Sequence, residues 1–216
     1  MNVVGILGSP SAVSRSASLL QLAQARLRTV TGHWQLIAVR ELPAQALVHA
    51  DLENPRVRHA IASVEDADLV LICTPIYKAS YSGVLKVFLD LLPQNALRGK
   101  TVLPMATGGS VAHLLALDYA LNPVLSALGA RDILDPVFAS DAQIAKHEVT
   151  GYAPLPEVAQ RVDAALQTVI DRAERSGRNA IAARERDELI ARLQPAAAPL
   201  IGRFELPLQS QHRTDP

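Results

Sequence analysis

The run that most constrains the fold of this chain is residues 67–74, Ala-Asp-Leu-Val-Leu-Ile-Cys-Thr, which is almost wholly apolar. A strand with water on one face alternates apolar and polar side chains, whereas a strand buried on both faces shows a continuous apolar run. Burial on both faces requires a layer of helices on each side of the sheet. The run therefore predicts an α/β fold built on a parallel sheet.

The rest of the chain repeats a strand followed by a helix. Strands are expected at residues 2–8, 33–39, 67–74, 101–106 and 133–138, and helices at residues 14–30, 54–66, 82–92, 111–128 and 156–175. No hairpin signal such as Asn-Gly separates the strands. This order predicts a doubly wound, five-stranded parallel sheet with helices on both faces, whose ligands bind beyond the carboxyl ends of the strands.

The C-terminal part of the sequence has a different character. Residues 178–193 carry a thin set of apolar side chains around a charge cluster at residues 184–188, and residues 195–216 show no useful periodicity. We expect a domain of residues 1–175 followed by an extension of residues 176–216 that is partly helical or disordered.

Charge and cysteine content exclude several classes of protein. The 21 basic and 21 acidic side chains cancel, so no strong field favours nucleic acid or an anionic membrane surface. The single cysteine, Cys73, forms neither an intramolecular disulfide nor a cysteine zinc site. The longest uncharged stretch, residues 101–117, is interrupted by proline and glycine and is too short to span a membrane. We expect a cytoplasmic protein without a metal site.

The loop after the first strand, residues 8–18, has the composition of a phosphate site. It holds five serines and Arg15 between a buried strand and the start of a helix. Hydroxyl groups, free backbone N–H groups and the helix dipole all favour an anion there. The loop lacks the lysine of a Walker motif and the third glycine of a dinucleotide site, so a monophosphate fits better. The alternative is that Ser14 only caps the helix.

The loops after the third and fourth strands complete the predicted site. Residues 74–83 contain two tyrosines in a chain with only 4% aromatic residues, and a planar ligand there would contact Ile76, Tyr77 and Lys78. Packing of these tyrosines at a helix start or a subunit contact is an equal alternative. Residues 107–110 place two glycines where backbone N–H groups can approach a ligand closely. We expect Cys73 to be an inert buried thiol and His113 to be a helix-face residue.

Pro123 predicts a defect in the helix of residues 111–128. Proline has no N–H and its ring presses on the carbonyl four residues earlier, that of Tyr119. A kink or a π-bulge near Tyr119 is expected. Either a functional bulge or a kinked core helix accounts for this pattern.

Together, these loops and residues 118–121 resemble the NADPH-dependent FMN reductases over about residues 1–175. The nearest match is the reductase of two-component alkanesulfonate monooxygenase systems. The resemblance implies a flavodoxin-like fold in which the FMN phosphate is held by Ser9, Ser14, Arg15 and Ser16. It places the flavin ring against Pro75, Ile76, Tyr77, Lys78, Thr107, Gly108, Gly109 and Ser110.

The resemblance also implies an activity. NADPH transfers a hydride to flavin N5, and reduced FMN leaves to serve a partner monooxygenase that releases sulfite from alkanesulfonates. The Gly108 and Gly109 amides are candidates for stabilising negative charge on the ring. Arg15 reaches either the FMN phosphate or the 2′-phosphate of NADPH. In the family, a tyrosine inserted in the fourth helix forms a π-helix at a tetramer interface, so Tyr119 implies a homo-oligomer, dimer or tetramer.

Three alternatives stay open at this point. They are a flavodoxin-like electron carrier, a quinone or azo-dye reductase with tightly bound FMN, and a flavin-free interaction domain. The formal charge of zero and the absence of a Thr/Ser-Gly phosphate loop speak against the carrier, since flavodoxin-like carriers are usually strongly acidic.

Overall fold

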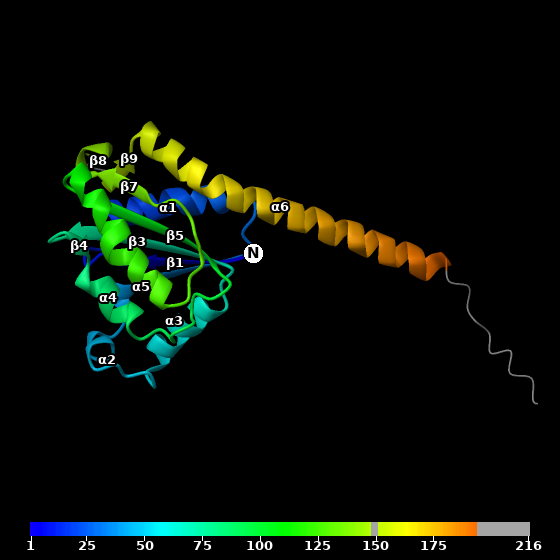
Figure 1. Cartoon of the computed structure of the whole chain (residues 1–216), viewed down its shortest axis with the longest axis horizontal. Coiled ribbons are helices and arrows are strands. Elements are labelled where there is room, and N and C mark those ends of the chain that lie inside the picture. The colour runs from blue at the N-terminus through cyan, green and yellow to red at the C-terminus, as the bar shows by residue number, and fades with distance from the viewer. Residues whose placement is uncertain (148–150, 194–216) are drawn as a thin grey trace, which may run out of the picture. The chain divides into compact units, whose positions relative to one another are not determined.

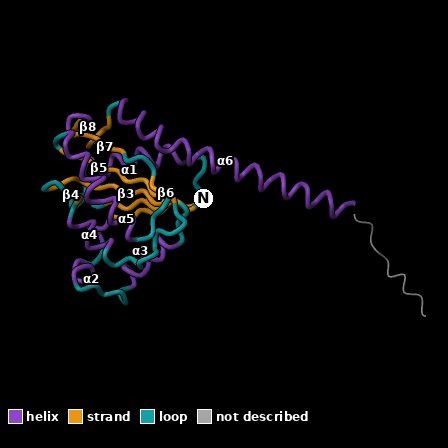
Figure 2. The backbone as a smooth tube through the Cα atoms, in the orientation of Figure 1, coloured by secondary structure: helices purple, strands orange, loops and turns teal. Residues whose placement is uncertain are grey.

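The computed structural model describes residues 1–147 and 151–193 (Figure 1). The chain divides into two compact units, Met1–Arg175 and Ser176–Pro216. The first unit contains a central sheet with helices around it, which Figure 2 shows as orange strands among purple helices. No helix within the described ranges combines the length and apolarity needed to cross a bilayer.

The central sheet confirms the predicted doubly wound topology. Its strands are β1 (Asn2–Leu7), β2 (His33–Ala38), β3 (Leu69–Tyr77), β5 (Thr101–Gly108), β6 (Asp132–Ile133) and β7 (Val137–Ser140). The order is β2-β1-β3-β5, with β6 and β7 both on the outer side of β5, and all of these pairs are parallel. This is the flavodoxin-like strand order, which reverses direction between β1 and β3.

Both faces of the sheet are covered, as the apolar run of residues 67–74 requires. Alternate residues of β3 join two separate cores, one of which includes Leu71 and the other Ile72. The Leu71 core is closed by α1 (Arg15–Leu27) and the first part of α6 (Pro156–Leu193). The Ile72 core is closed by the other helices, α2 (Ala44–Val48), α3 (Pro55–Glu65), α4 (Gly83–Leu89) and α5 (Asn122–Ala127).

The fifth strand differs from the prediction of one strand at residues 133–138. It is split into β6 and β7, which flank Asp135 and Pro136. Pro136 has no N–H to donate to the sheet and restricts the backbone of the residue before it, so pairing stops there. β7 continues to Ser140, which carries the following residues to the carboxyl edge of the sheet.

Two antiparallel strand pairs that no Asn-Gly signal indicated lie beside the parallel strands. β3 extends beyond its predicted end to Tyr77 and pairs with β4 (Ser80–Tyr81), and β8 (Ile144–His147) pairs with β9 (Gly151–Pro154). The turn between β3 and β4 consists of Lys78 and Ala79, with φ angles of 50° and 61°. Asn-Gly is the usual signal for a turn with two positive φ angles, and Lys-Ala carries no such signal.

The predicted π-bulge near Tyr119 is confirmed. The segment expected as one helix begins with the 3₁₀ helix η2 (Val111–Leu114), continues as the π-helix η3 (Leu117–Leu121) and ends as α5. The Asn122 N–H donates to the Leu117 carbonyl, five residues back. Because Pro123 cannot donate to Tyr119, the helix widens at this point.

The helix α6 runs from Pro156 to Leu193 and so extends past the predicted helix of residues 156–175. Gly177 costs the helix about 1 kcal/mol relative to alanine but does not stop it. Within the first unit, α6 buries side chains at helical spacing, namely Val158, Val162, Leu166 and Val169. The expectation for residues 194–216 lies outside the described residues.

Candidate functional site

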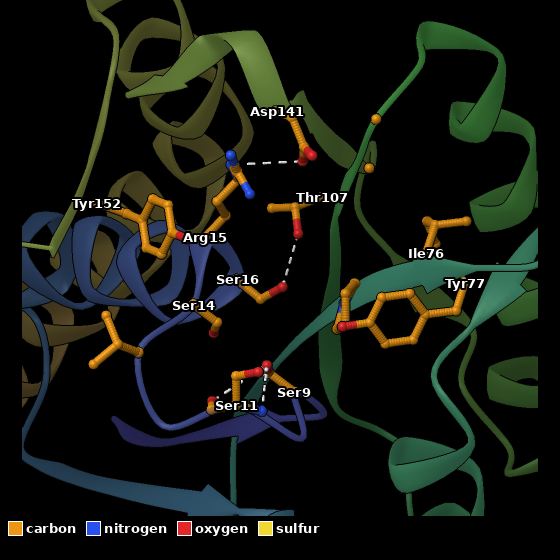
Figure 3. A pocket seen from close by; sticks show the side chains of 14 residues that line it. Ser9, Ser11, Ser14, Arg15, Ser16, Ile76, Tyr77, Thr107, Asp141 and Tyr152 are labelled. Carbon is orange, nitrogen blue, oxygen red and sulfur yellow. Dashed lines mark hydrogen bonds and ion pairs between the residues drawn. The ribbon is translucent and has the colours of Figure 1, made fainter. Parts of the chain in front are cut away.

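A pocket of about 180 Å³ lies where the loops after β1, β3 and β5 converge at the carboxyl edge of the sheet (Figure 3). These loops are far apart in the sequence, and the parallel topology brings their ends together. Most of the predicted site residues line this pocket: Ser9, Ser14, Arg15, Ser16, Pro75, Ile76, Tyr77, Thr107, Gly108 and Gly109.

Two predicted site residues lie outside the pocket lining. Lys78 is exposed in the turn between β3 and β4. Ser110 is also exposed, and its Oγ accepts a hydrogen bond from the Ala112 N–H at 3.3 Å, at the start of η2. Both residues flank the pocket without lining it.

The serines of the first loop differ in their remaining hydrogen-bonding capacity. The Ser9 hydroxyl accepts from the Ser11 N–H at 3.2 Å and donates to the Ser11 carbonyl at 3.3 Å, so it shapes the loop. Ser14 caps α1, since its Oγ accepts from the Ala17 N–H at 3.1 Å. Within the described residues, the hydroxyl proton of Ser14 has no acceptor, which leaves it as a donor for a ligand.

Arg15 supplies the positive charge of the pocket. Its guanidinium carbon lies 4.8 Å from the centre of the Tyr152 ring, and its Nε lies 3.6 Å from Asp141 Oδ1 (Figure 3). The Nε atom is buried and has no hydrogen-bond partner among the described residues. A buried donor without a partner is costly, so this N–H is suited to an anionic ligand.

Buried hydroxyl groups join the three loops to one another. Ser16 Oγ and Thr107 Oγ1 are hydrogen-bonded at 2.8 Å, which ties the start of α1 to the end of β5. The Ser82 hydroxyl donates to the Gly8 carbonyl, and the Ser82 N–H donates to Thr74 Oγ1 at 3.1 Å. Buried polar groups that are satisfied in this way fix the relative positions of the loops.

Two glycines of these loops are required by close packing. A Cβ atom at Gly8 would lie 2.6 Å from Leu85 Cβ, and one at Gly108 would lie 2.8 Å from His113 Nδ1. A Cβ at Gly109 would meet no atom of the described residues within 4 Å. The space beside Gly109 is therefore open, and a residue with a side chain would make the pocket narrower there.

Cys73 and His113 lie beside the pocket but do not line it. The Cys73 thiol is buried and donates to the Ser16 carbonyl at 3.1 Å. Burial raises the pKa of this thiol well above its usual value, so Cys73 stays neutral, as expected for an inert residue. His113 packs on Gly108, and its Nδ1 is buried without a hydrogen-bond partner among the described residues.

Four lining residues were missed by sequence reasoning: Ser11, Val13, Asp141 and Tyr152. Ser11 and Val13 belong to the loop that was predicted, but not to the residues selected from it. Asp141 directly follows β7, and the rule that ligands bind at the carboxyl ends of strands was a usable signal for it. Tyr152 lies in a hairpin that no sequence signal indicated.

The pocket combines two kinds of surface. One end presents serine hydroxyls, the start of α1 and Arg15, and the other presents Ile76, Tyr77 and the glycines that follow β5. Half of the Tyr77 side chain is exposed, so the second end is open to solvent. This arrangement suits a ligand with an anionic group on one end and a flat, largely apolar body on the other.

Comparison with known proteins gives the family. The profile of the NADPH-dependent FMN reductases matches residues 1–144, which include all three loops. This chain belongs to the NADPH-dependent FMN reductase family. It is 48% identical over 169 residues to FMN reductase (NADPH) of Pseudomonas putida, covering 78% of this chain and 86% of the relative. It is 45% identical over 173 residues to FMN reductase (NADPH) of Escherichia coli, covering 78% and 87%.

Solved structures agree with this membership. The chain is similar to the apo form of the NADH:FMN oxidoreductase EmoB, with a TM-score of 0.69 and 41% identity over 77% of this chain and 86% of that one. The protein is thus an oxidoreductase of a family that uses FMN and NADPH. The residues present fit FMN, because the Arg15 Nε–H, at the polar end, has no hydrogen-bond partner among the described residues and the end lined by Ile76 and Tyr77 is open.

Proposed function

We propose that FMN enters this pocket as an exchangeable substrate, with its phosphate at the first loop and its ring over the second and third loops. The observation that carries this proposal is the buried Nε of Arg15, which has no hydrogen-bond partner among the described residues and lies at the polar end of the pocket, while Ile76 and Tyr77 line the other end. The phosphate would contact Ser9, Ser14, Arg15 and Ser16. The ring would lie against Pro75, Ile76, Tyr77, Thr107, Gly108 and Gly109.

In the proposed reaction the protein binds and orients FMN and stabilises charge on it, and it contributes no reactive side chain. Bound FMN provides the hydride acceptor for NADPH, and transfer of a hydride needs no general base from the protein. With FMN bound, the backbone amides of Gly108 and Gly109 would lie beside the ring and would stabilise negative charge on it. Lack of a side chain at Gly109 keeps the open side accessible to the nicotinamide.

The reduced FMN is proposed to serve a flavin-dependent monooxygenase that desulfonates alkanesulfonates in the cytoplasm. The open end of the pocket at Tyr77 supports an exchangeable flavin, and the loop motifs of this chain resemble reductases of such systems. The test is a reconstitution with an alkanesulfonate monooxygenase. Sulfite release should require NADPH, FMN and this protein together, and release at the same rate without this protein would remove the role.

The π-helix is proposed to lie in a homo-oligomer interface. Tyr119 is 80% exposed, and Val111 and Leu115, on the preceding turns, are 71% and 55% exposed. Large exposed apolar side chains that lie close together on a surface are typical of interaction sites. Sedimentation velocity should show a dimer or tetramer, and a monomer at micromolar concentration would contradict the proposal.

The activity itself is tested by NADPH oxidation with and without free FMN, together with the flavin content of the purified protein. The proposal predicts oxidation that rises with added FMN and little flavin retained through purification. Retained flavin with quinone turnover in the absence of free FMN would indicate a quinone reductase. Flavin binding without NADPH oxidation would indicate an electron carrier.

A further inference from the structure

Asp141 holds a fixed position at the polar end of the pocket. It begins the 3₁₀ turn η4 (Asp141–Gln143), which directly follows β7. The Gln143 side-chain oxygen accepts from the Ser140 N–H at 3.1 Å and from Arg161 Nη2 at 2.9 Å. The turn is therefore anchored both to the end of the sheet and to α6, which positions the Asp141 backbone at the edge of the pocket.

The carboxylate of Asp141 neutralises Arg15 without satisfying its Nε. The separation of 3.6 Å between Nε and Oδ1 is an ion pair beyond hydrogen-bond length, and Nε has no other partner among the described residues. The side chains of Arg15 and Asp141 are 32% and 47% exposed, so solvent screens the pair only in part. Among the described residues that line the pocket, Arg15 is the only cation and Asp141 the only anion, and their formal charges cancel.

A phosphate monoester carries a charge of about −1.5 to −2 at neutral pH. Its arrival beside Arg15 places a second anion close to the Asp141 carboxylate, and like charges at such separations repel. We infer that Asp141 sets the affinity of the site for the phosphate group and keeps FMN exchangeable. The inference rests on the proposed function, because it requires that FMN binds here through its phosphate.

A different role for Asp141 would be to anchor Arg15. The guanidinium already stacks on Tyr152 at 4.8 Å and would keep this contact without the carboxylate. The two roles predict opposite results. Neutralising a repelling carboxylate tightens FMN binding, whereas removing an anchor weakens it.

The test is a fluorescence titration of FMN and riboflavin into the wild type, Asp141→Asn and Asp135→Asn, each as the full chain. Asp135 is exposed and does not line the pocket, so its substitution makes the same change in net charge elsewhere. We expect the dissociation constant of FMN to fall roughly five- to tenfold in Asp141→Asn at low salt, with a smaller change at high salt. Asp135→Asn should match the wild type, and riboflavin should bind all three proteins equally.

An unchanged or weaker affinity of Asp141→Asn for FMN would overturn the inference, as would an equal gain for riboflavin, which lacks the phosphate. If Asp141→Asn fails to fold by circular dichroism, Asp141→Ser provides a second neutral variant with the same expected direction. Failure of the wild type to bind FMN or riboflavin would instead reject the proposed function. If the wild type binds FMN but Asp141→Asn binds it no more tightly, only the inference about Asp141 is rejected.

Discussion

Arg15 tests the proposed phosphate site at the level of a single side chain. Arg15→Ala removes a charge-assisted contact and should weaken FMN binding by about 1.5–3 kcal/mol. Binding of riboflavin should not change, because it has no phosphate for Arg15 to contact. Titration by flavin fluorescence measures both affinities.

The same variant separates two ligands for Arg15. Unchanged FMN affinity, combined with a raised KM for NADPH but not for NADH, would show that the arginine faces the nucleotide 2′-phosphate instead. The wild-type protein, assayed with both nucleotides, is the reference for this comparison.

Gly108 and Gly109 form a matched pair of positions with different surroundings. In Gly108→Ala, the new methyl would lie 2.8 Å from His113 Nδ1, so the His113 side chain or the loop must shift and the melting temperature should fall. In Gly109→Ala, the methyl would have no atom of the described part of the chain within 4 Å, so stability should be close to that of the wild type while FMN reduction slows. Thermal denaturation and steady-state kinetics on both variants check this. Wild-type turnover in Gly109→Ala would remove this residue from the ring site.

The sequence predicted those pocket residues that lie together in one short segment. The serines and Arg15 lie in one loop between a strand and a helix, where composition alone indicates an anion site. Asp141 and Tyr152 enter the pocket only because β7 ends at Ser140 and a hairpin follows it. The position of Asp141 at the end of a strand was a usable signal for the pocket, whereas Tyr152 reaches Arg15 only through a hairpin that no sequence pattern indicated.

Among the elements, the π-helix η3 is a widened helical turn that we propose to lie in the homo-oligomer interface. Deletion of Tyr119 shortens the widened turn by one residue and should give a more regular helix. We expect altered oligomerisation and slower flavin exchange, because the exposed tyrosine is proposed to lie in the interface. Sedimentation velocity and FMN-dependent NADPH oxidation measure the two effects.

Pro123→Ala provides the control for this deletion. In this variant the backbone N–H at position 123 can donate to the Tyr119 carbonyl, and Tyr119 is kept. If the widened turn persists, the extra residue Tyr119 causes it; if the turn becomes regular, Pro123 causes it. Wild-type assembly and kinetics in the Tyr119 deletion would show that the π-helix has no role beyond accommodating the chain.

The strands that are buried on both faces were the easiest elements to predict from the sequence. β1, β3 and β5 are buried on both faces, so their apolar runs identify them and fix the parallel sheet. The fifth strand was predicted as one strand from the apolar residues on either side of Asp135 and Pro136, and the missing N–H of Pro136, which splits it, was not taken into account. The β3–β4 hairpin turns at Lys78 and Ala79, two residues that rarely adopt positive φ angles, so propensity gave no warning of it.

For the whole molecule, the proposed active unit is residues 1–175. All residues that line the pocket, and the buried residues of α6 up to Val169, lie in the first compact unit. Truncation after Arg175 should therefore leave FMN-dependent NADPH oxidation unchanged. Steady-state kinetics of the truncated and full-length proteins check this, and a large loss of kcat/KM would show that the extension contributes to activity.

The central claim is that three loops at the carboxyl edge of the sheet hold FMN, with the phosphate at the start of α1. A crystal structure of the protein with FMN tests this most directly. The account predicts the phosphate in contact with Ser14 and Arg15, and the flavin ring beside Tyr77 and Gly109. Flavin bound elsewhere on the chain, or in this pocket with its phosphate pointing away from Arg15, would contradict it.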